Sequence, residues 1–201
     1  MQGPVSMTST EDIMKFFASQ QPRRVVTFLG YSGSGYEDPL AMLRAADAAL
    51  DRLDPNQTII NIGATAQGVG AIYDLAKRKG FMTTGIVSTQ AREQGVALAS
   101  NVDHVFYVED PNWGGVVPGT RTLSPTSSMM VAVSDEIIAL GGGDAARDEY
   151  LEAQRLGKRV TFVPCEMDHD VAKEKARRQG LEEPRDFRGS AHRRIVSAED
   201  K

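Results

Sequence analysis

Short apolar runs alternate with amphipathic stretches along most of the chain. The apolar runs are rich in Val, Ile and Phe, and such runs predict buried β-strands. The expected strands cover residues 24–29, 58–62, 82–87, 104–108, 136–140 and 159–163. Between them, apolar residues recur at helical spacing, which predicts helices. The expected helices cover residues 39–53, 69–78, 90–99, 126–133 and 144–156.

This alternation predicts an α/β fold of the Rossmann-like, doubly wound kind, with a mostly parallel sheet between two layers of helices. We expect a single nucleotide-binding domain over residues 23–165. A polar lead covers residues 1–22, and a helix over residues 8–21 is one interpretation of it. Residues 166–201 are dense in both charges and predict a surface helix to about residue 179, followed by a ragged tail.

Composition and charge indicate which kinds of ligand or partner the protein can bind. The apolar share of 41% and the charged share of 25% are ordinary for a soluble globular protein. A net charge of -4 argues against broad nucleic-acid binding, which depends on many Lys and Arg contacts to phosphate. We identify no membrane span and no signal peptide. A cytoplasmic protein with a small-molecule ligand is therefore expected.

Cysteine and histidine offer little for metal binding. Cys165 is the single cysteine, so no intrachain disulfide is possible. His104, His169 and His192 lack the spacing of a structural metal site. We predict no metal and no required cofactor, although a bound nucleotide or nucleotide-like cofactor remains open.

Glycine-rich turns follow three of the expected strands. They are residues 30–35 (GYSGSG), 63–70 (GATAQGVG) and 141–143 (GGG). The carboxyl ends of parallel strands share one edge of a sheet, which is where such folds bind ligands. Helix N-termini there present free amides that attract anions, and glycine lets a ligand approach closely. The turns predict a phosphate site, although glycine also serves simply to turn the chain.

The spacing within these turns matches neither common nucleotide motif. The first two turns do not contain G-x-G-x-x-G, and no G-K-[ST] follows any turn. The dinucleotide fingerprint and the Walker A loop are both excluded.

Three segments resemble the Rossmann-like proteins often labelled lysine decarboxylases. This group includes the LOG-type cytokinin-activating phosphoribohydrolases, the molybdenum-cofactor carrier protein and the DNA-processing DprA proteins. The segments are VTFLGYSGS at 26–34, NIGATAQGVGA at 61–71 and SDEIIALGGG at 134–143, the last followed by Glu149. The resemblance covers residues 24–163 and implies the same fold and, commonly, a homodimer.

The resemblance also implies roles for particular residues. In the phosphoribohydrolases, a glycine loop holds the phosphate of a nucleoside monophosphate while a Glu, aided by an Arg, supports loss of the base. Glu149 matches the family's Glu. The other catalytic candidates are Arg121, which lies near the family's Arg position but off register, and Arg147, one turn into the helix. The ligand-binding candidates are Gly30, Ser32, Gly33, Ser34, Gly63, Ala64, Thr65, Gly68, Gly141, Gly142, Gly143, Asp144, Ala145 and Ala146. Trp113 could stack on a base or pin its loop to the body.

Two departures from the family pattern bear on whether the protein cleaves its ligand or only binds it. Thr126 and Ser127 stand where the family has an Arg-Lys pair, and Ala145 and Ala146 replace a Gly and a Thr. A carrier or sensor that binds a nucleotide-like ligand without cleaving it is the first hypothesis. An N-glycosidase acting on nucleoside 5'-monophosphates is the alternative. Single-strand DNA binding, as in DprA, is disfavoured by the acidic balance.

Overall fold

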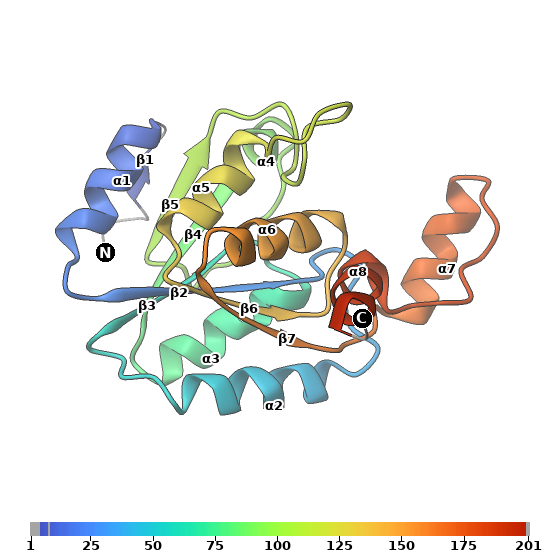
Figure 1. The fold of residues 1–201 in the computed structure, drawn as a ribbon, viewed down its shortest axis with the longest axis horizontal. Coiled ribbons are helices and arrows are strands. Elements are labelled where there is room, and N and C mark those ends of the chain that lie inside the picture. Colours follow the sequence, from blue (N-terminus) through green and yellow to red (C-terminus); the bar gives the residue numbers. More distant parts are fainter. Residues whose placement is uncertain (1–4, 8, 200–201) are drawn as a thin grey trace.

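A single parallel sheet organises the molecule (Figure 1). The computed structural model describes residues 5–7 and 9–199, and this part of the chain contains seven strands. The strands are β1 Val5–Met7, β2 Arg24–Gly30, β3 Thr58–Ile62, β4 Met82–Ser88, β5 His104–Val108, β6 Glu136–Leu140 and β7 Arg159–Val163. Their order is β1-β5-β4-β3-β2-β6-β7, and every neighbouring pair is parallel. The predicted doubly wound fold class is confirmed.

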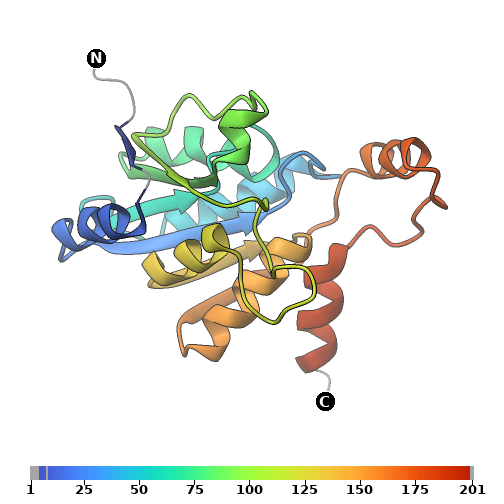
Figure 2. The same ribbon diagram turned by 90° about the horizontal axis from the view of Figure 1, so that it is seen from above.

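Helices cover both faces of the sheet, which gives three layers (Figures 1 and 2). One face carries α1 Thr10–Ser19, α5 Pro125–Val133, α6 Asp144–Arg155 and α8 Gly189–Glu199, and the other carries α2 Pro39–Leu50 and α3 Ile72–Arg78. The short helices η1 Gly68–Ala71 and α4 Gln90–Glu93 follow β3 and β4. Helix α7 His169–Arg178 projects away from the body in both views.

The strands are apolar on both sides because both faces of the sheet are covered. In β2, Val25 and Leu29 belong to the buried cluster that includes residues of α1, α5, α6 and α8. Val26 and Phe28 belong to the cluster that includes residues of α2 and α3. Alternate residues of a strand point to opposite faces. The continuous apolar runs in the sequence therefore follow directly from the parallel topology.

Local sequence signals set where α2 and α5 begin. Asp38 precedes Pro39 at the start of α2, and its side chain accepts a hydrogen bond from the Ala41 amide at 2.7 Å. Ser124 and Pro125 begin α5 in the same way. Such capping residues satisfy amides that have no partner within the helix, and proline tolerates the first helical position.

The segment after β4 differs from the prediction. A helix was expected over residues 90–99, but α4 ends at Glu93. Gly95 has a φ of 63°, and beyond it Leu98 forms an antiparallel bridge with Thr65. The Ala99 amide donates to the Ala64 carbonyl at 3.0 Å. Pairing with the loop after β3 therefore replaces the last turns of the expected helix.

The C-terminal segment also differs from the ragged tail that was expected. Helix α8 covers residues 189–199 and packs against α6, with Ala191 and Ile195 buried. At the other end of the chain, α1 confirms a helix within the lead, with Ile13 and Phe17 buried. Residue 8 of that interpretation and residues 200–201 of the tail lie outside the described residues. Crossing a bilayer needs a long apolar helix, and residues 5–7 and 9–199 contain none.

We predict that Gly68→Ala destabilises the protein more than Gly80→Ala. Both glycines have positive φ, of 58° and 85°, so alanine costs about 1–2 kcal/mol at either position. A Cβ at Gly68 would also collide with the backbone carbonyls of Tyr31 and Ser32, whereas one at Gly80 meets nothing within 4 Å. That collision adds about 1–3 kcal/mol. Free energies of unfolding in urea measure the difference, and equal losses would contradict the contact.

Candidate functional site

The glycine turns after β2 and β3 are in direct contact. The Val69 amide donates to the Tyr31 carbonyl at 2.7 Å, and Gly68 leaves room for this approach because a Cβ there would collide with Tyr31. Tyr36 ties the first turn to the end of β6, since its hydroxyl donates to the Leu140 carbonyl at 2.9 Å. Strands β2 and β6 are neighbours across the point where the strand order reverses. This is the usual ligand position in such sheets.

The third glycine turn, residues 141–143, is covered by the chain itself. The Gly141 amide donates to the Val163 carbonyl at 2.9 Å. The Gly142 carbonyl accepts from the Ala191 amide at 3.2 Å, at the start of α8. The Tyr31 hydroxyl donates to the Arg188 carbonyl at 2.8 Å, which closes the same edge. Gly141 and Gly142 are therefore buried by these contacts, and no residue of this turn lines the cavity described below.

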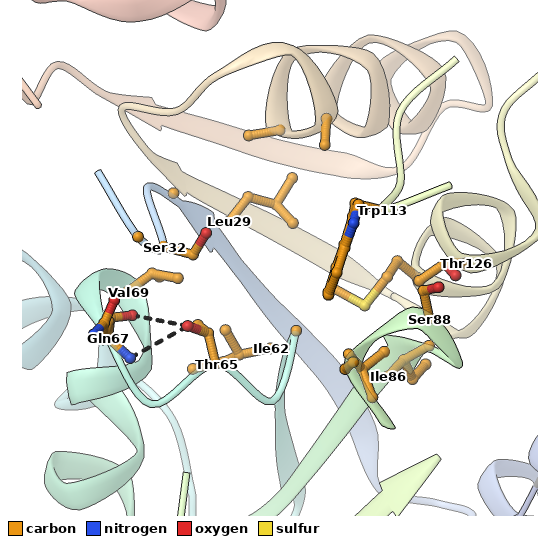
Figure 3. A pocket seen from close by; sticks show the side chains of 18 of the residues that line it. Leu29, Ser32, Ile62, Thr65, Gln67, Val69, Ile86, Ser88, Trp113 and Thr126 are labelled. Atoms are coloured by element: carbon orange, nitrogen blue, oxygen red, sulfur yellow. Dashed lines mark hydrogen bonds between the residues drawn. The ribbon is translucent and has the colours of Figure 1, made fainter. Parts of the chain in front are cut away.

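A cavity of about 480 Å³ opens beside the first two turns, and Figure 3 shows it from close by. Its walls come from the ends of β2, β3 and β4, from residues 96–98, from α5 and α6, and from Trp113. Most of the lining is apolar. The large apolar side chains are Phe28, Leu29, Ile62, Val69, Ile86, Val87, Val96, Leu98, Trp113 and Met130. Such a surface suits a flat ring or another apolar group.

The two sides of the opening differ in chemistry. In Figure 3, Ser32, Thr65 and Gln67 lie on one side, whereas Trp113 and Thr126 lie on the other. The amides of Ser32 and Gly33 have no partner in the described part of the chain. The cavity thus combines a rim of hydroxyl and amide donors with an apolar body.

Helix α6 contributes its N-terminus and a carboxyl group. No side chain caps this helix, and Ala145 and Ala146 of its first turn line the cavity. The amides of a first helical turn lack intrahelical partners and attract anions. Within the described residues that line the cavity, Glu149 is the one ionisable side chain.

Glu149 is buried, with 6% of its surface exposed. Its Oε1 accepts a hydrogen bond from the Ser127 hydroxyl at 2.5 Å, and its Oε2 has no partner in the described chain. Burial raises the pKa of Glu149 to about 7; the Ser127 bond opposes this shift and the nearby Asp148 adds to it. The carboxyl therefore changes charge near neutral pH.

Trp113 lies on a loop that is firmly attached to the helices below it. The Gly115 amide donates to Ser127 Oγ at 2.7 Å, and the Val116 amide donates to Asp148 Oδ2 at 2.9 Å. The indole itself is 51% exposed at the mouth of the cavity. Trp113 is thus placed to contact a ligand, and hydrogen bonds of its neighbours hold the loop.

Thr126 and Ser127 have structural roles here. Asp110 accepts the Thr126 amide at 2.9 Å, which fixes the start of α5. The Asp110 carboxylate also lies near the Thr126 hydroxyl. Thr126 Oγ1 is buried, and none of its contacts has the geometry of a hydrogen bond. Ser127 links Glu149 to the Trp113 loop. Neither residue replaces the charge of an Arg-Lys pair.

The structure divides the residues predicted from the sequence into two groups. Those that line the cavity are Gly30, Ser32, Gly33, Gly63, Thr65, Ala145, Ala146 and Glu149. Those that do not are Ser34, Ala64, Gly68, Arg121, Gly141, Gly142, Gly143, Asp144 and Arg147. Whether the first group binds a ligand stays a prediction.

The two candidate cations lie away from the cavity. Arg121 is exposed on the loop before α5. Arg147 pairs with Asp144 at 2.7 Å and with Asp148 at 2.8 Å, and it lines a separate open cleft with Arg193 and Arg194 of α8. Neither arginine is placed to assist Glu149 in this structure.

Sequence reasoning did not identify several residues of the site. Met130 falls in the helix expected over residues 126–133 and was not among the site candidates, but it lines the cavity. Val96 and Leu98 were placed in a helix, but they form a wall because of the bridge between Leu98 and Thr65. No local pattern marks the pairing of Ser127 with Glu149.

The fold and the cavity together define a class: a doubly wound α/β protein with a small-molecule-sized pocket at its switch point. No protein-family model matches the chain, and no curated protein matches it. Among solved structures, the chain is similar to the molybdenum cofactor binding protein of the phototrophic bacterium Rippkaea orientalis, with a TM-score of 0.53 and 16% identity over 80% of this chain and 86% of that one.

Two structures of the molybdenum cofactor carrier protein of Chlamydomonas reinhardtii are also similar. Their TM-scores are 0.49 and 0.47, with 18% and 17% identity. These alignments cover 70% and 79% of this chain and 76% and 85% of those chains. The similarity to the Rippkaea orientalis structure, at 16% identity, supports the expected fold.

We predict that the stability of Glu149→Gln, compared with that of the wild type, increases from pH 5 to pH 8. The raised pKa means that the folded state holds a proton on Glu149 that the unfolded state has released, so wild-type stability falls between the usual carboxyl range and about pH 7. Full deprotonation costs on the order of 3 kcal/mol. Gln keeps the shape of the side chain and cannot ionise.

The measurement is the free energy of unfolding in urea from pH 5 to pH 8 for both proteins. The difference between variant and wild type isolates Glu149 from other titrating groups. A difference that does not change with pH would show that Glu149 has an ordinary pKa.

Proposed function

We propose that this protein binds a small, phosphate-bearing, nucleotide-like ligand in the cavity and holds it without cleaving it. The observation that carries this proposal is a cavity of about 480 Å³ with unpaired amides on one side and an aromatic, apolar body on the other. That volume falls within the range of about 300–1,000 Å³ for small-molecule sites.

The phosphate group is assigned to the amide side. Ser32 and Gly33 of the first turn offer backbone donors that are not used within the described part of the chain. Backbone amides bind a phosphate without a cation, as helix N-termini do. Below pH 7, burial keeps Glu149 of the same cavity mostly neutral, which reduces repulsion of an anion.

The ring of the ligand is assigned to the apolar side. Trp113 stands at the mouth, and Met130 and Leu98 contribute to the walls. A flat heterocycle stacks favourably on an indole and gains about 1–3 kcal/mol from the contact. A role as a carrier is in keeping with the shared fold of the molybdenum cofactor binding protein from Rippkaea orientalis.

The surroundings of Glu149 favour binding over hydrolysis. Cleavage of an N-glycosidic bond develops positive charge on the ribose, which an ionised carboxylate stabilises. Here burial favours the neutral form, and the described residues place no arginine or lysine in the cavity. N-glycosidase action remains the second candidate because Glu149 lines the same cavity.

Binding is tested by titration calorimetry against a panel of nucleoside monophosphates. We expect Trp113→Ala to weaken the binding of the best ligand about tenfold or more, because it removes one stacking contact. Leu156→Ala is the matched control, since Leu156 is 50% exposed on the far end of α6 and does not line the cavity. No binding to any panel member would overturn the proposal.

The phosphate position is tested by Gly33→Asp against Gly33→Asn. A Cβ at Gly33 approaches only Gln67 Oε1, at 3.8 Å, so both side chains fit and differ in charge alone. We expect the Asp variant to bind a monophosphate about tenfold more weakly than the Asn variant, and both to bind the phosphate-free nucleoside equally. Equal loss for both ligands would place the phosphate elsewhere.

Hydrolysis is tested by incubating the protein with nucleoside monophosphates and measuring free base. We expect none above the rate without protein. Base release that is lost in Glu149→Ala would establish the N-glycosidase instead. Base release that persists in this variant would assign the activity to other residues.

A further inference from the structure

Glu149 has an unusual position for a carboxyl group, because one oxygen is bound by the protein and the other is left to the cavity. Ser127 Oγ accepts the Gly115 amide at 2.7 Å and donates its own hydrogen to Glu149 Oε1 at 2.5 Å. Oε2 has no partner among the described residues, yet it is not fully closed off from solvent. Oε2 therefore faces open space in the cavity that Glu149 lines.

As long as Ser127 donates to Oε1, the proton of the neutral carboxyl lies on the other oxygen. Oε1 already receives the hydrogen of Ser127, so a proton on the same oxygen would meet another hydrogen. The neutral acid therefore carries its proton on Oε2 and presents an O–H donor to the cavity. Ionised, the same oxygen presents only acceptors. Ser127 is a positioning residue: it holds Oε1, so that Oε2 is the oxygen that meets a ligand.

The charged side chains around Glu149 are few, and those on α6 and α8 have other surroundings. Helix α5 and residues 112–118 contain no ionisable side chain. On α6 itself, Asp148 is bound by Arg147 and by the Val116 amide. The basic side chains of α8, Arg193 and Arg194, line the separate cleft on the other side of α6, beside Asp144. A ligand in the cavity is thus the remaining partner for Oε2.

We infer that Glu149 is a specificity residue that reads the ring edge of the ligand and selects a heterocycle with a carbonyl oxygen at that point over one with an amine. Glu149 belongs to the Trp113 side of the cavity, because Ser127 binds both Glu149 and the Trp113 loop. A carbonyl oxygen accepts the Oε2 proton, whereas an amine brings a second donor against it. This inference rests on the proposed binding of a nucleotide-like ligand.

Inosine and adenosine 5'-monophosphate form a matched pair of probes. Both have the same ribose phosphate, and at position 6 of the ring inosine has a carbonyl oxygen where adenosine has an amine. Changes in phosphate ionisation act on both equally, so the ratio of their dissociation constants reports the ring edge alone. We expect the wild type to prefer inosine monophosphate about tenfold at pH 6, the worth of one well-placed hydrogen bond.

The preference should decline several-fold as the pH rises from 6 to 8, because the carboxylate accepts from an amine and repels a carbonyl oxygen. In Glu149→Gln, the side-chain NH2 group faces the cavity as a donor at every pH, since Ser127 continues to hold the carbonyl oxygen. The variant should keep the inosine preference and lose its pH dependence. Glu152→Gln is the control, because Glu152 lies on the same helix, pairs with Arg155 and does not line the cavity.

Titration calorimetry with the full chain at pH 6, 7 and 8 distinguishes the outcomes, with circular dichroism to confirm that each variant is folded. Binding of both nucleotides with a ratio that is flat in pH in the wild type, or a ratio that still falls with pH in Glu149→Gln, overturns the role of Glu149 and leaves the proposed function intact. Absence of binding by either nucleotide at all three pH values overturns the inference, and the proposed function falls with it if no other nucleoside monophosphate of the panel binds. A ratio that falls with pH in wild type and in Glu152→Gln, but not in Glu149→Gln, supports it.

Discussion

The site depends on the close approach of backbone to backbone where β2 and β6 end. Gly30 leaves space for the Tyr36 hydroxyl, which bonds both the Tyr31 amide and the Leu140 carbonyl. A side chain at Gly30 would collide with that hydroxyl. Through Tyr31, the same turn contacts the turn after β3 and the segment before α8. Tyr31 and Tyr36 therefore link the first turn to the end of β6, to the turn after β3 and to the segment before α8.

The electrostatics of the cavity follow from what its walls lack. Within the described lining there is no cation, and the one carboxyl is buried. Burial of an ionised group without a partner is unfavourable, so the group takes up a proton instead. The result is a site in which backbone amides supply the attraction for an anion. Such a site discriminates ligands by shape and by hydrogen-bond pattern more than by charge.

Much of the fold could be predicted from the sequence because its signals are local. The run Arg24–Leu29 and the turn at Gly30–Gly35 follow one another in the chain, and the parallel topology then places each turn at one edge. The features that the sequence did not predict depend on contacts between segments far apart in the chain. The Leu98–Thr65 bridge, the Ala191 contact with Gly142 and the Ser127 bond to Glu149 have no local signature. The sequence therefore predicted the edge of the sheet that holds the cavity, but not which turn the chain itself would close.

Closure of the third turn by α8 has a consequence for biosynthesis. Chains emerge from the ribosome N-terminus first, and domains fold as their sequence becomes available. The strands and the first two turns are complete once β7 has emerged, but Arg188 and Ala191, which close the edge at Gly142, come later. A nascent chain halted between β7 and α8 would therefore expose its sheet edge to solvent or to a chaperone, and only the later segment would seal it.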